Sequence, residues 1–304
     1  MGWYRLQGWP SARGCGTIEP VRLAGWIGYG CLLRDWVMKL GVTLRNMGPQ
    51  SSSEIMRGAT VEAESQGFES VWITDHIAIP PDDAEGSEGR YTDPLTTLAW
   101  LAGATTTIKL GVGVLVVPYR PALPTAKAIA TVQELSANRL LLGLAVGWMD
   151  AEFRALGLDR HQRGRQTDEV LEFLNRCFSD DIVVSNGQPF LFKPRPERPA
   201  MYVGGRAPHA LRRAVRFGHG WLPMARDPAS LKADMSMFFE IARAAGTTPG
   251  PVTAMAALPL SEPDRAREHL ESYAEMGLER LVCALRYDTL DEYRALLQSL
   301  VALG

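Results

Sequence analysis

An acid and an imidazole directly follow a short apolar run. Asp75 and His76 come after Val71, Trp72 and Ile73, whose β-branched and aromatic side chains predict a strand buried on both faces. In parallel α/β folds, the C-terminal ends of the strands carry the active site. A histidine there exchanges a proton near neutral pH, and a neighbouring carboxylate orients it. The pair therefore predicts a proton-transfer site, with a turn aspartate beside a solvated histidine as the alternative.

A glycine pair offers a site for an anion. Gly204 and Gly205 follow a predicted strand at residues 201–203 and precede Arg206 and a helical pattern. Backbone N–H groups at a helix start, the helix dipole and the guanidinium together favour a phosphate-bearing cofactor. The alternative is a tight turn that needs glycine only for its dihedral angles. Barrel phosphate sites are frequent after the seventh or eighth strand, whereas this is the fifth, so its position adds no support.

Two other strand ends carry glycines. Gly111 and Gly113 match part of a dinucleotide fingerprint, but the third glycine and the directly following helix are missing, which excludes a Rossmann site. Gly147 precedes Trp148 at the end of another apolar run. A glycine at a strand end lets a ligand approach the backbone, and Trp148 offers a flat wall beside a ring system. The alternative is that Trp148 only covers the rim of the fold.

The other histidines are weaker candidates. His161 and His209 lie near predicted helix starts and His269 lies in a charged helical pattern, so all three are expected to be solvated. His219 precedes a predicted strand and is a secondary pocket candidate. The sequence contains no serine nucleophile elbow, Walker loop or H-E-x-x-H motif.

The elements that position these residues alternate along the chain. Eight alternations of strand and helix favour a (β/α)₈ TIM barrel, a single domain of typical size, over a doubly wound open sheet. A proline-rich segment at residues 188–199 is expected to be an insertion loop before the fifth strand. The predicted strands are residues 39–44, 70–73, 109–114, 139–145, 201–203, 220–222, 252–257 and 280–284.

Helical faces and caps are also visible. Ser51 and Glu54 resemble a capping box, and Asp227 with Pro228 marks another helix start. Two apolar faces at helical spacing are Val170, Phe173, Leu174 and Cys177, and Leu290, Tyr293, Leu297 and Leu300.

Composition narrows the class of protein. The chain has 304 residues, 46% hydrophobic and 22% charged, with a net charge of −2, as in an ordinary globular protein. This charge gives no reason to expect nucleic acid or a membrane as partner. The cysteines are far apart, which favours reduced thiols in the cytoplasm over disulfides or a metal site. They are Cys15, Cys31, Cys177 and Cys283.

The first 37 residues differ from the rest. They hold four of the eight tryptophans and show no clear periodicity, and their most apolar part is too short and glycine-rich to span a bilayer. They also lack the order of a signal peptide. We expect translation to begin naturally at Met38 and residues 1–37 to be a spurious or disordered extension.

The motifs together resemble the luciferase-like monooxygenase superfamily, and within it the branch that uses the deazaflavin coenzyme F420. The resemblance covers residues 38–304. It is carried by residues 67–72 with Asp75 and His76, and by residues 91–94, 110–118, 138–148, 163–169, 203–205 and 220–223.

The resemblance implies a TIM barrel with a flavin-like cofactor across the C-terminal mouth. The phosphate is expected on Gly204, Gly205 and Arg206, and the ring against Val114 and Leu115, with a non-prolyl cis peptide between these two. His76 matches the position beside the hydride-transferring carbon, where Asp75 orients it.

One residue departs from the pattern of the family. In the sugar-phosphate dehydrogenase branch, the position of Trp148 holds an acid partner. The tryptophan therefore predicts that His76 lacks this acidic helper and that the substrate is less polar than a sugar phosphate.

Three functions follow from these expectations. The first is an F420-dependent oxidoreductase that transfers a hydride to or from a small organic substrate. The second is an FMNH₂-dependent monooxygenase, which needs a separate flavin reductase and a water-excluding pocket. The third, a barrel that binds a ligand without turnover, is disfavoured by Asp75 and His76. Relatives also suggest a homodimer.

Overall fold

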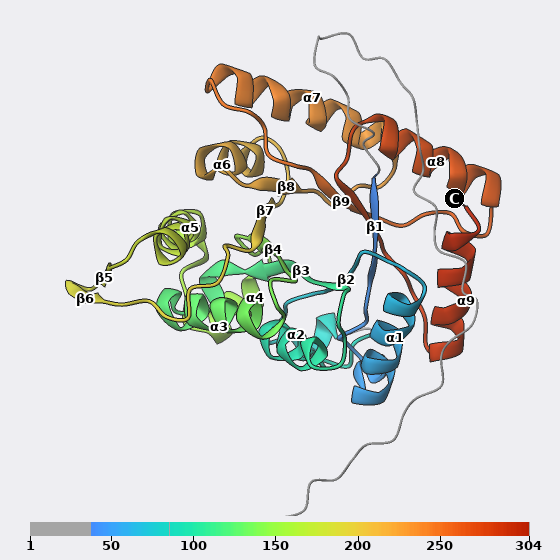
Figure 1. Cartoon of the computed structure of the whole chain (residues 1–304), viewed down its shortest axis with the longest axis horizontal. Coiled ribbons are helices and arrows are strands. Elements are labelled where there is room, and N and C mark those ends of the chain that lie inside the picture. Colours follow the sequence, from blue (N-terminus) through green and yellow to red (C-terminus); the bar gives the residue numbers. More distant parts are fainter. Residues whose placement is uncertain (1–37, 85, 304) are drawn as a thin grey trace, which may run out of the picture.

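The computed structural model describes residues 38–84 and 86–303, and the predicted extension at residues 1–37 lies outside them. In this described part, eight parallel strands form a nearly closed barrel with helices outside it (Figure 1). The strand order is β8-β7-β4-β3-β2-β1-β10-β9, and bridges from Trp221 to Val252 and from Met224 to Met255 join the two edge strands. The strands are β1 (Lys39–Thr43), β2 (Ser70–Ile73), β3 (Lys109–Val116), β4 (Leu140–Ala145), β7 (Ala200–Gly204), β8 (Gly220–Leu222), β9 (Thr253–Ala256) and β10 (Arg280–Cys283).

The predicted TIM barrel and all eight predicted strands are confirmed, with ends that differ by at most two residues. The α-helices are α1 (Ser53–Ser65), α2 (Pro94–Ala102), α3 (Ala122–Leu135), α4 (Asp150–Ala155), α5 (Arg163–Ser179), α6 (His209–Phe217), α7 (Pro228–Ala244), α8 (Pro263–Glu275) and α9 (Leu290–Val301). Short 3₁₀ helices are η1 (Pro49–Ser51), η2 (Pro81–Asp83), η3 (Val117–Tyr119) and η4 (Arg160–Gln162). None of the described helices is long and apolar enough to cross a lipid bilayer.

The predicted helical faces on α5 and α9 pack against the core. The helix start predicted at Asp227 and Pro228 is confirmed. Asp227 also forms a capping box, since its side chain accepts a hydrogen bond from the backbone N–H of Ser230 at 2.7 Å. The prediction of a capping box formed by Ser51 and Glu54 is wrong. Ser52 caps α1 by accepting from Ile55, while the Ser51 hydroxyl donates to the carbonyl of Gly48 inside η1.

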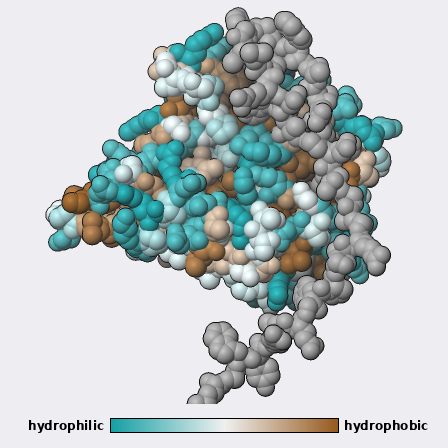
Figure 2. All heavy atoms as spheres, in the orientation of Figure 1, coloured by the Kyte–Doolittle hydropathy of each residue, from teal (hydrophilic) through white to brown (hydrophobic). Residues whose placement is uncertain are grey.

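A hairpin overlaps the start of the insertion loop predicted at residues 188–199, and residues 191–199 form a loop before β7, as predicted. Strands β5 (Val183–Ser185) and β6 (Gln188–Phe190) pair antiparallel and project from the barrel (Figure 1). Asn186 and Gly187 join them, both with positive φ, which is the two-residue turn that best matches strand twist. Apolar side chains show at the end of the projection (Figure 2).

The barrel interior is filled around Trp72. This indole is fully buried and packs with Leu141, Tyr202 and Met255. A Cβ atom added at Gly111 would lie 2.3 Å from the Trp72 ring. Gly111 is therefore glycine because the indole needs the space, which gives it a packing role in place of a dinucleotide-binding one.

An ion pair closes the N-terminal end of the barrel. The guanidinium of Arg280, only 1% exposed, donates two hydrogen bonds to Glu69 at 2.6 and 2.8 Å and one each to Tyr202 and Thr253. Burial opposes ionisation of Glu69, but Arg280 outweighs it and lowers the pKa of this carboxyl to about 2. With this end sealed by charge and packing, the opposite mouth is the end available for chemistry.

The burial of His219 predicts that the stability of the fold decreases in mild acid. It is 3% exposed and its Nε2 has no partner among the described residues. Burial, and then the charge of Arg198, lower its pKa from 6.5 to about 4. Between these values the unfolded chain binds more protons than the folded one, so the free energy of unfolding falls as the pH drops through this window.

We expect His219→Gln to remove about 2 kcal/mol of the stability loss between pH 7 and pH 5, as measured by urea unfolding. The carboxyls of Glu69 and Glu152, with pKa values of about 2, take up few protons at pH 5 and do not obscure the effect. Exposed His161 provides the control substitution, His161→Gln. Equal acid sensitivity in the wild type and His219→Gln would contradict the assignment.

Candidate active site

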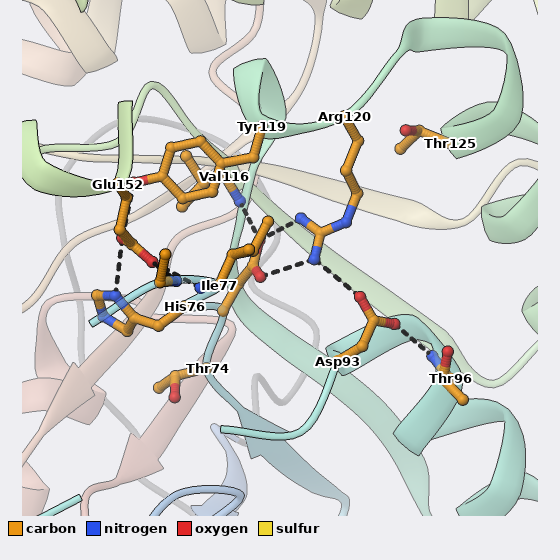
Figure 3. A network of polar contacts seen from close by, with 12 residues as sticks. Thr74, His76, Ile77, Asp93, Thr96, Val116, Tyr119, Arg120, Thr125 and Glu152 are labelled. Atoms are coloured by element: carbon orange, nitrogen blue, oxygen red, sulfur yellow. Dashed lines mark hydrogen bonds and ion pairs between the residues drawn. The ribbon is translucent and has the colours of Figure 1, made fainter. Parts of the chain in front are cut away.

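His76 lies at the C-terminal mouth of the barrel, three residues beyond the end of β2. Its side chain is 19% exposed, and its Nδ1 lies 3.0 Å from Oε2 of Glu152 (Figure 3). Glu152 belongs to α4, the short helix that follows β4. The imidazole is therefore held between the ends of two strands that lie on either side of β3.

The Glu152 carboxylate is fully buried and accepts four hydrogen bonds. Besides His76, the donors are the hydroxyl of Tyr119 at 2.8 Å and the backbone N–H groups of Ile77 and Ala78 at 2.5 and 3.1 Å. Burial opposes ionisation, but these donors outweigh it and lower the pKa of Glu152 to about 2. Burial and the hydrogen bond to Glu152 raise the pKa of Tyr119 far above its usual range, so this hydroxyl stays protonated.

This arrangement selects one tautomer of His76. An ionised carboxylate only accepts hydrogen bonds, so Nδ1 of His76 must carry the proton it shares with Glu152. In the neutral imidazole, Nε2 then has a free lone pair and can take a proton from a ligand. The predicted absence of an acidic helper is wrong. Trp148 does not supply a carboxylate, but Glu152, four residues further along, does.

Asp75 does not contact His76 through its carboxylate, contrary to the prediction. It accepts hydrogen bonds at 2.7 and 2.8 Å from the guanidinium of Arg120 and at 2.8 Å from the backbone N–H of Val116. Arg120 also donates to Asp93, the N-cap of α2. Burial disfavours the charge on Arg120, but Asp75 and then Asp93 outweigh this and raise its pKa. Asp75 thus ties the end of β2 to the end of β3.

A second polar clamp fixes the segment before His76. Asn46, which is fully buried and follows β1, accepts hydrogen bonds from the backbone N–H and the hydroxyl of Thr74, each at 3.0 Å. Its amide donates to the carbonyls of Thr74 and Thr92. The loop that carries His76 is therefore held on both sides of β2.

Two aromatic rings flank His76. The Tyr91 ring is tilted against the imidazole with centroids 4.9 Å apart, and the Trp148 ring meets it edge to face at 6.3 Å. Trp148 is 64% exposed. It thus stands beside the imidazole at the mouth, and its role as a flat wall for a bound ring stays a prediction.

The two cofactor candidates on β3 point in different directions. Val114 is half-buried and packs with the residues of the barrel interior, whereas Leu115 is 1% exposed and packs between the sheet and the helices. Leu115 therefore cannot face a ligand at the mouth as predicted. The non-prolyl cis peptide lies between Gly113 and Val114, one bond earlier than expected, where the pairing of β3 with β4 shifts register.

Gly204 and Gly205 have different roles. Gly204 is buried, and an added Cβ atom would lie 2.5 Å from Cγ1 of Val114, so its missing side chain makes room for β3. Gly205 is exposed with φ of +127°, a conformation that favours glycine, and Arg206 beside it is exposed. Together with the first turn of α6, Gly205 and Arg206 form the part of the loop open to an anion.

Sequence reasoning did not identify Glu152, Tyr119 or Arg120 as parts of the site. Glu152 had a visible signal, since it lies in the first turn of a helix that follows a predicted strand end. Tyr119 and Arg120 lie just beyond β3, next to the residues predicted to face the cofactor ring. Their partners come from other strands, so spacing alone did not connect them.

A comparison with known families agrees with the barrel fold. Residues 38–298 match the model of the luciferase-like monooxygenases. The chain belongs to this family and is an oxidoreductase.

The names of individual relatives state different cofactors. An F420-dependent glucose-6-phosphate dehydrogenase of Kineococcus radiotolerans is 28% identical, over 72% of this chain and 68% of its own. An F420-dependent hydroxymycolic acid dehydrogenase of Mycobacterium tuberculosis is 28% identical, over 78% and 68%. An FMNH₂-dependent dimethylsulfone monooxygenase of Pseudomonas fluorescens is 29% identical, over 49% and 43%. Among solved structures, monooxygenase RslO1 of Streptomyces bottropensis shares the fold with a TM-score of 0.73 at 18% identity, covering 87% of this chain and 98% of its own.

Proposed function

We propose that this protein is an F420-dependent oxidoreductase in which His76 exchanges a proton with a small organic substrate during hydride transfer. The observation that carries the proposal is the contact between His76 and the buried, ionised Glu152 at the barrel mouth. It leaves Nε2 of a neutral imidazole available as a base, and of a protonated one as an acid. The names of the two F420-dependent relatives support the deazaflavin.

The residues at the mouth fit a phosphate-bearing ring cofactor. Gly205 and Arg206 are exposed at the start of α6, where backbone dipoles and a guanidinium favour a phosphate. Val114 is half-buried in the barrel interior and provides an apolar surface for a ring. When bound, a deazaflavin supplies a carbon atom that takes up or releases a hydride.

The protein residues then handle the proton. In substrate oxidation, Nε2 of His76 takes the hydroxyl proton of the substrate as a hydride leaves the adjacent carbon. In reduction, the same nitrogen returns a proton to the developing oxyanion. Glu152 holds the imidazole in one orientation and stabilises its protonated form, while Tyr119 holds Glu152. Asp75 and Arg120 keep the loop in place and act only through this positioning.

An FMNH₂-dependent monooxygenase is the second candidate, favoured by the similarity to the dimethylsulfone monooxygenase. It would use the same phosphate loop and require reduced flavin from a separate reductase. His76 and Glu152 serve proton transfer in either reaction, so these two residues do not discriminate between the cofactors.

Titration of the purified protein with F420 and, separately, with FMN distinguishes the two candidates. We expect F420 to bind at least about tenfold more tightly than FMN, a difference of about 1.4 kcal/mol, followed by absorbance and fluorescence of each cofactor. The variant Arg206→Ala tests the site by weakening whichever cofactor binds. Tighter binding of FMN would overturn the deazaflavin proposal in favour of the monooxygenase.

A further inference from the structure

We propose that the side chains around His76 form a recognition site for an apolar ring, aromatic or alicyclic, in the substrate. This inference rests on the proposed function, because it assigns the substrate class of that same site. Three side chains make up the site: Tyr91, Trp148 and Ile77.

Tyr91 and Trp148 come from separate segments and meet at the imidazole, and Ile77 directly follows His76. Tyr91 precedes α2, and Trp148 follows β4. The two aromatic rings flank His76 at 4.9 and 6.3 Å between centroids. Trp148 is 64% exposed and Ile77 is 44% exposed. An apolar ring that reaches His76 would remove part of this surface from water, which favours binding.

The exposure of Trp148 is built into the backbone. The preceding Gly147 has φ of +78°, and a Cβ atom there would lie 2.6 Å from Cγ1 of Val116. Only glycine fits both the dihedral angle and the contact. The indole is therefore presented at the mouth by the loop geometry, while the neighbouring Met149 and Phe153 turn inward and are buried.

The charges near His76 disfavour an anionic substrate group. Arg120 is held by two carboxylates, Asp75 and Asp93, and Glu152 is held by four donors. A phosphate next to the imidazole would face the negative charge of Glu152 and would have to displace Asp75 or Asp93 from Arg120. An uncharged ring is not repelled by Glu152 and does not compete with Asp75 or Asp93 for Arg120.

The test measures the affinity of 2-naphthol, a neutral aromatic probe, for the F420-loaded protein by saturation-transfer NMR. Trp148→Ala is expected to weaken the affinity about tenfold, and Trp148→Phe to retain most of it. Ile77→Ser removes the exposed apolar side chain that follows His76 and is expected to weaken binding in the same direction. Leu191→Ala removes a side chain that is 70% exposed outside the site and serves as the matched control, with no expected change. Glucose 6-phosphate is expected not to displace the probe.

Loss of the probe signal on addition of glucose 6-phosphate, no binding of 2-naphthol to the wild type, or equal affinity in wild type and Trp148→Ala would each overturn the inference. Repeating the probe measurement without cofactor separates it from the proposed function. If F420 fails to bind but Trp148→Ala still weakens 2-naphthol binding, the cofactor assignment fails and the apolar site stands. If F420 binds but Trp148→Ala leaves the binding of 2-naphthol unchanged, the cofactor assignment stands and the apolar site fails.

Discussion

His76→Asn is expected to lower kcat by about 10²–10⁴-fold, the usual contribution of a positioned acid or base. Asparagine keeps an N–H group that can donate to Glu152 as Nδ1 of His76 does, so the buried carboxylate retains its partner. What is lost is Nε2, the atom that exchanges the proton. The measurement is steady-state turnover followed by deazaflavin absorbance, together with the affinity for F420, which should change little.

The matched control is His269→Asn. His269 lies on α8, where the same change removes an imidazole without touching the mouth. Its turnover is expected to equal that of the wild type. Wild-type turnover in His76→Asn would remove His76 from the mechanism, and a parallel loss of F420 affinity would indicate a role in binding.

Glu152→Gln is expected to lower kcat by about 10²–10³-fold through the wrong tautomer of His76, an effect of the kind known when a carboxylate that orients a catalytic histidine becomes an amide. The amide oxygen can still accept from the N–H groups of Ile77 and Ala78. The amide NH₂ then faces Nδ1 of His76, and two donors cannot pair, so the proton moves to Nε2. The base needed for substrate oxidation is then blocked.

Nitrogen NMR of the histidine rings provides the readout that a merely structural role would not change. The wild type is expected to show His76 protonated at Nδ1, and Glu152→Gln to show it protonated at Nε2. The matched control is Tyr119→Phe, which removes one donor from Glu152 but keeps the contact to His76, and should cost less than about tenfold. The same tautomer in the wild type and Glu152→Gln would refute the positioning role.

Much of the fold followed from local patterns. The eight strands were predicted because each is a short apolar run bounded by turn residues, and parallel strands buried on both faces need such runs. The hairpin of β5 and β6 was missed even though its turn, Asn186 and Gly187, is a strong hairpin signal, because the surrounding prolines indicated a loop. The cap of α1 was placed one residue too early, since Ser51 and Ser52 both have the side chain of a cap.

The site was predicted less completely, because its contacts join segments far apart in the chain. His76 was found because a histidine after a buried strand is a local signal. Leu115 was misassigned because a register shift in β3 decides which side chains face the barrel interior, and no alternation in the sequence marks it.

The sequence by itself determined that an acid and an imidazole stand at one end of a parallel barrel. Only the tertiary structure decided which carboxylate serves the imidazole. Asp75 adjoins His76 in the chain, yet its carboxylate turns to Arg120. The end of β3 places a backbone N–H beside it, and the 3₁₀ helix η3 that follows places the guanidinium there. Glu152 is 76 residues away from His76 in the chain, but α4 follows β4, two strands from β2 in the sheet, and places the carboxylate at the same mouth. Buried donors keep it ionised there. Adjacency along the chain sets which strand end a residue occupies, whereas the neighbouring strands set its partner.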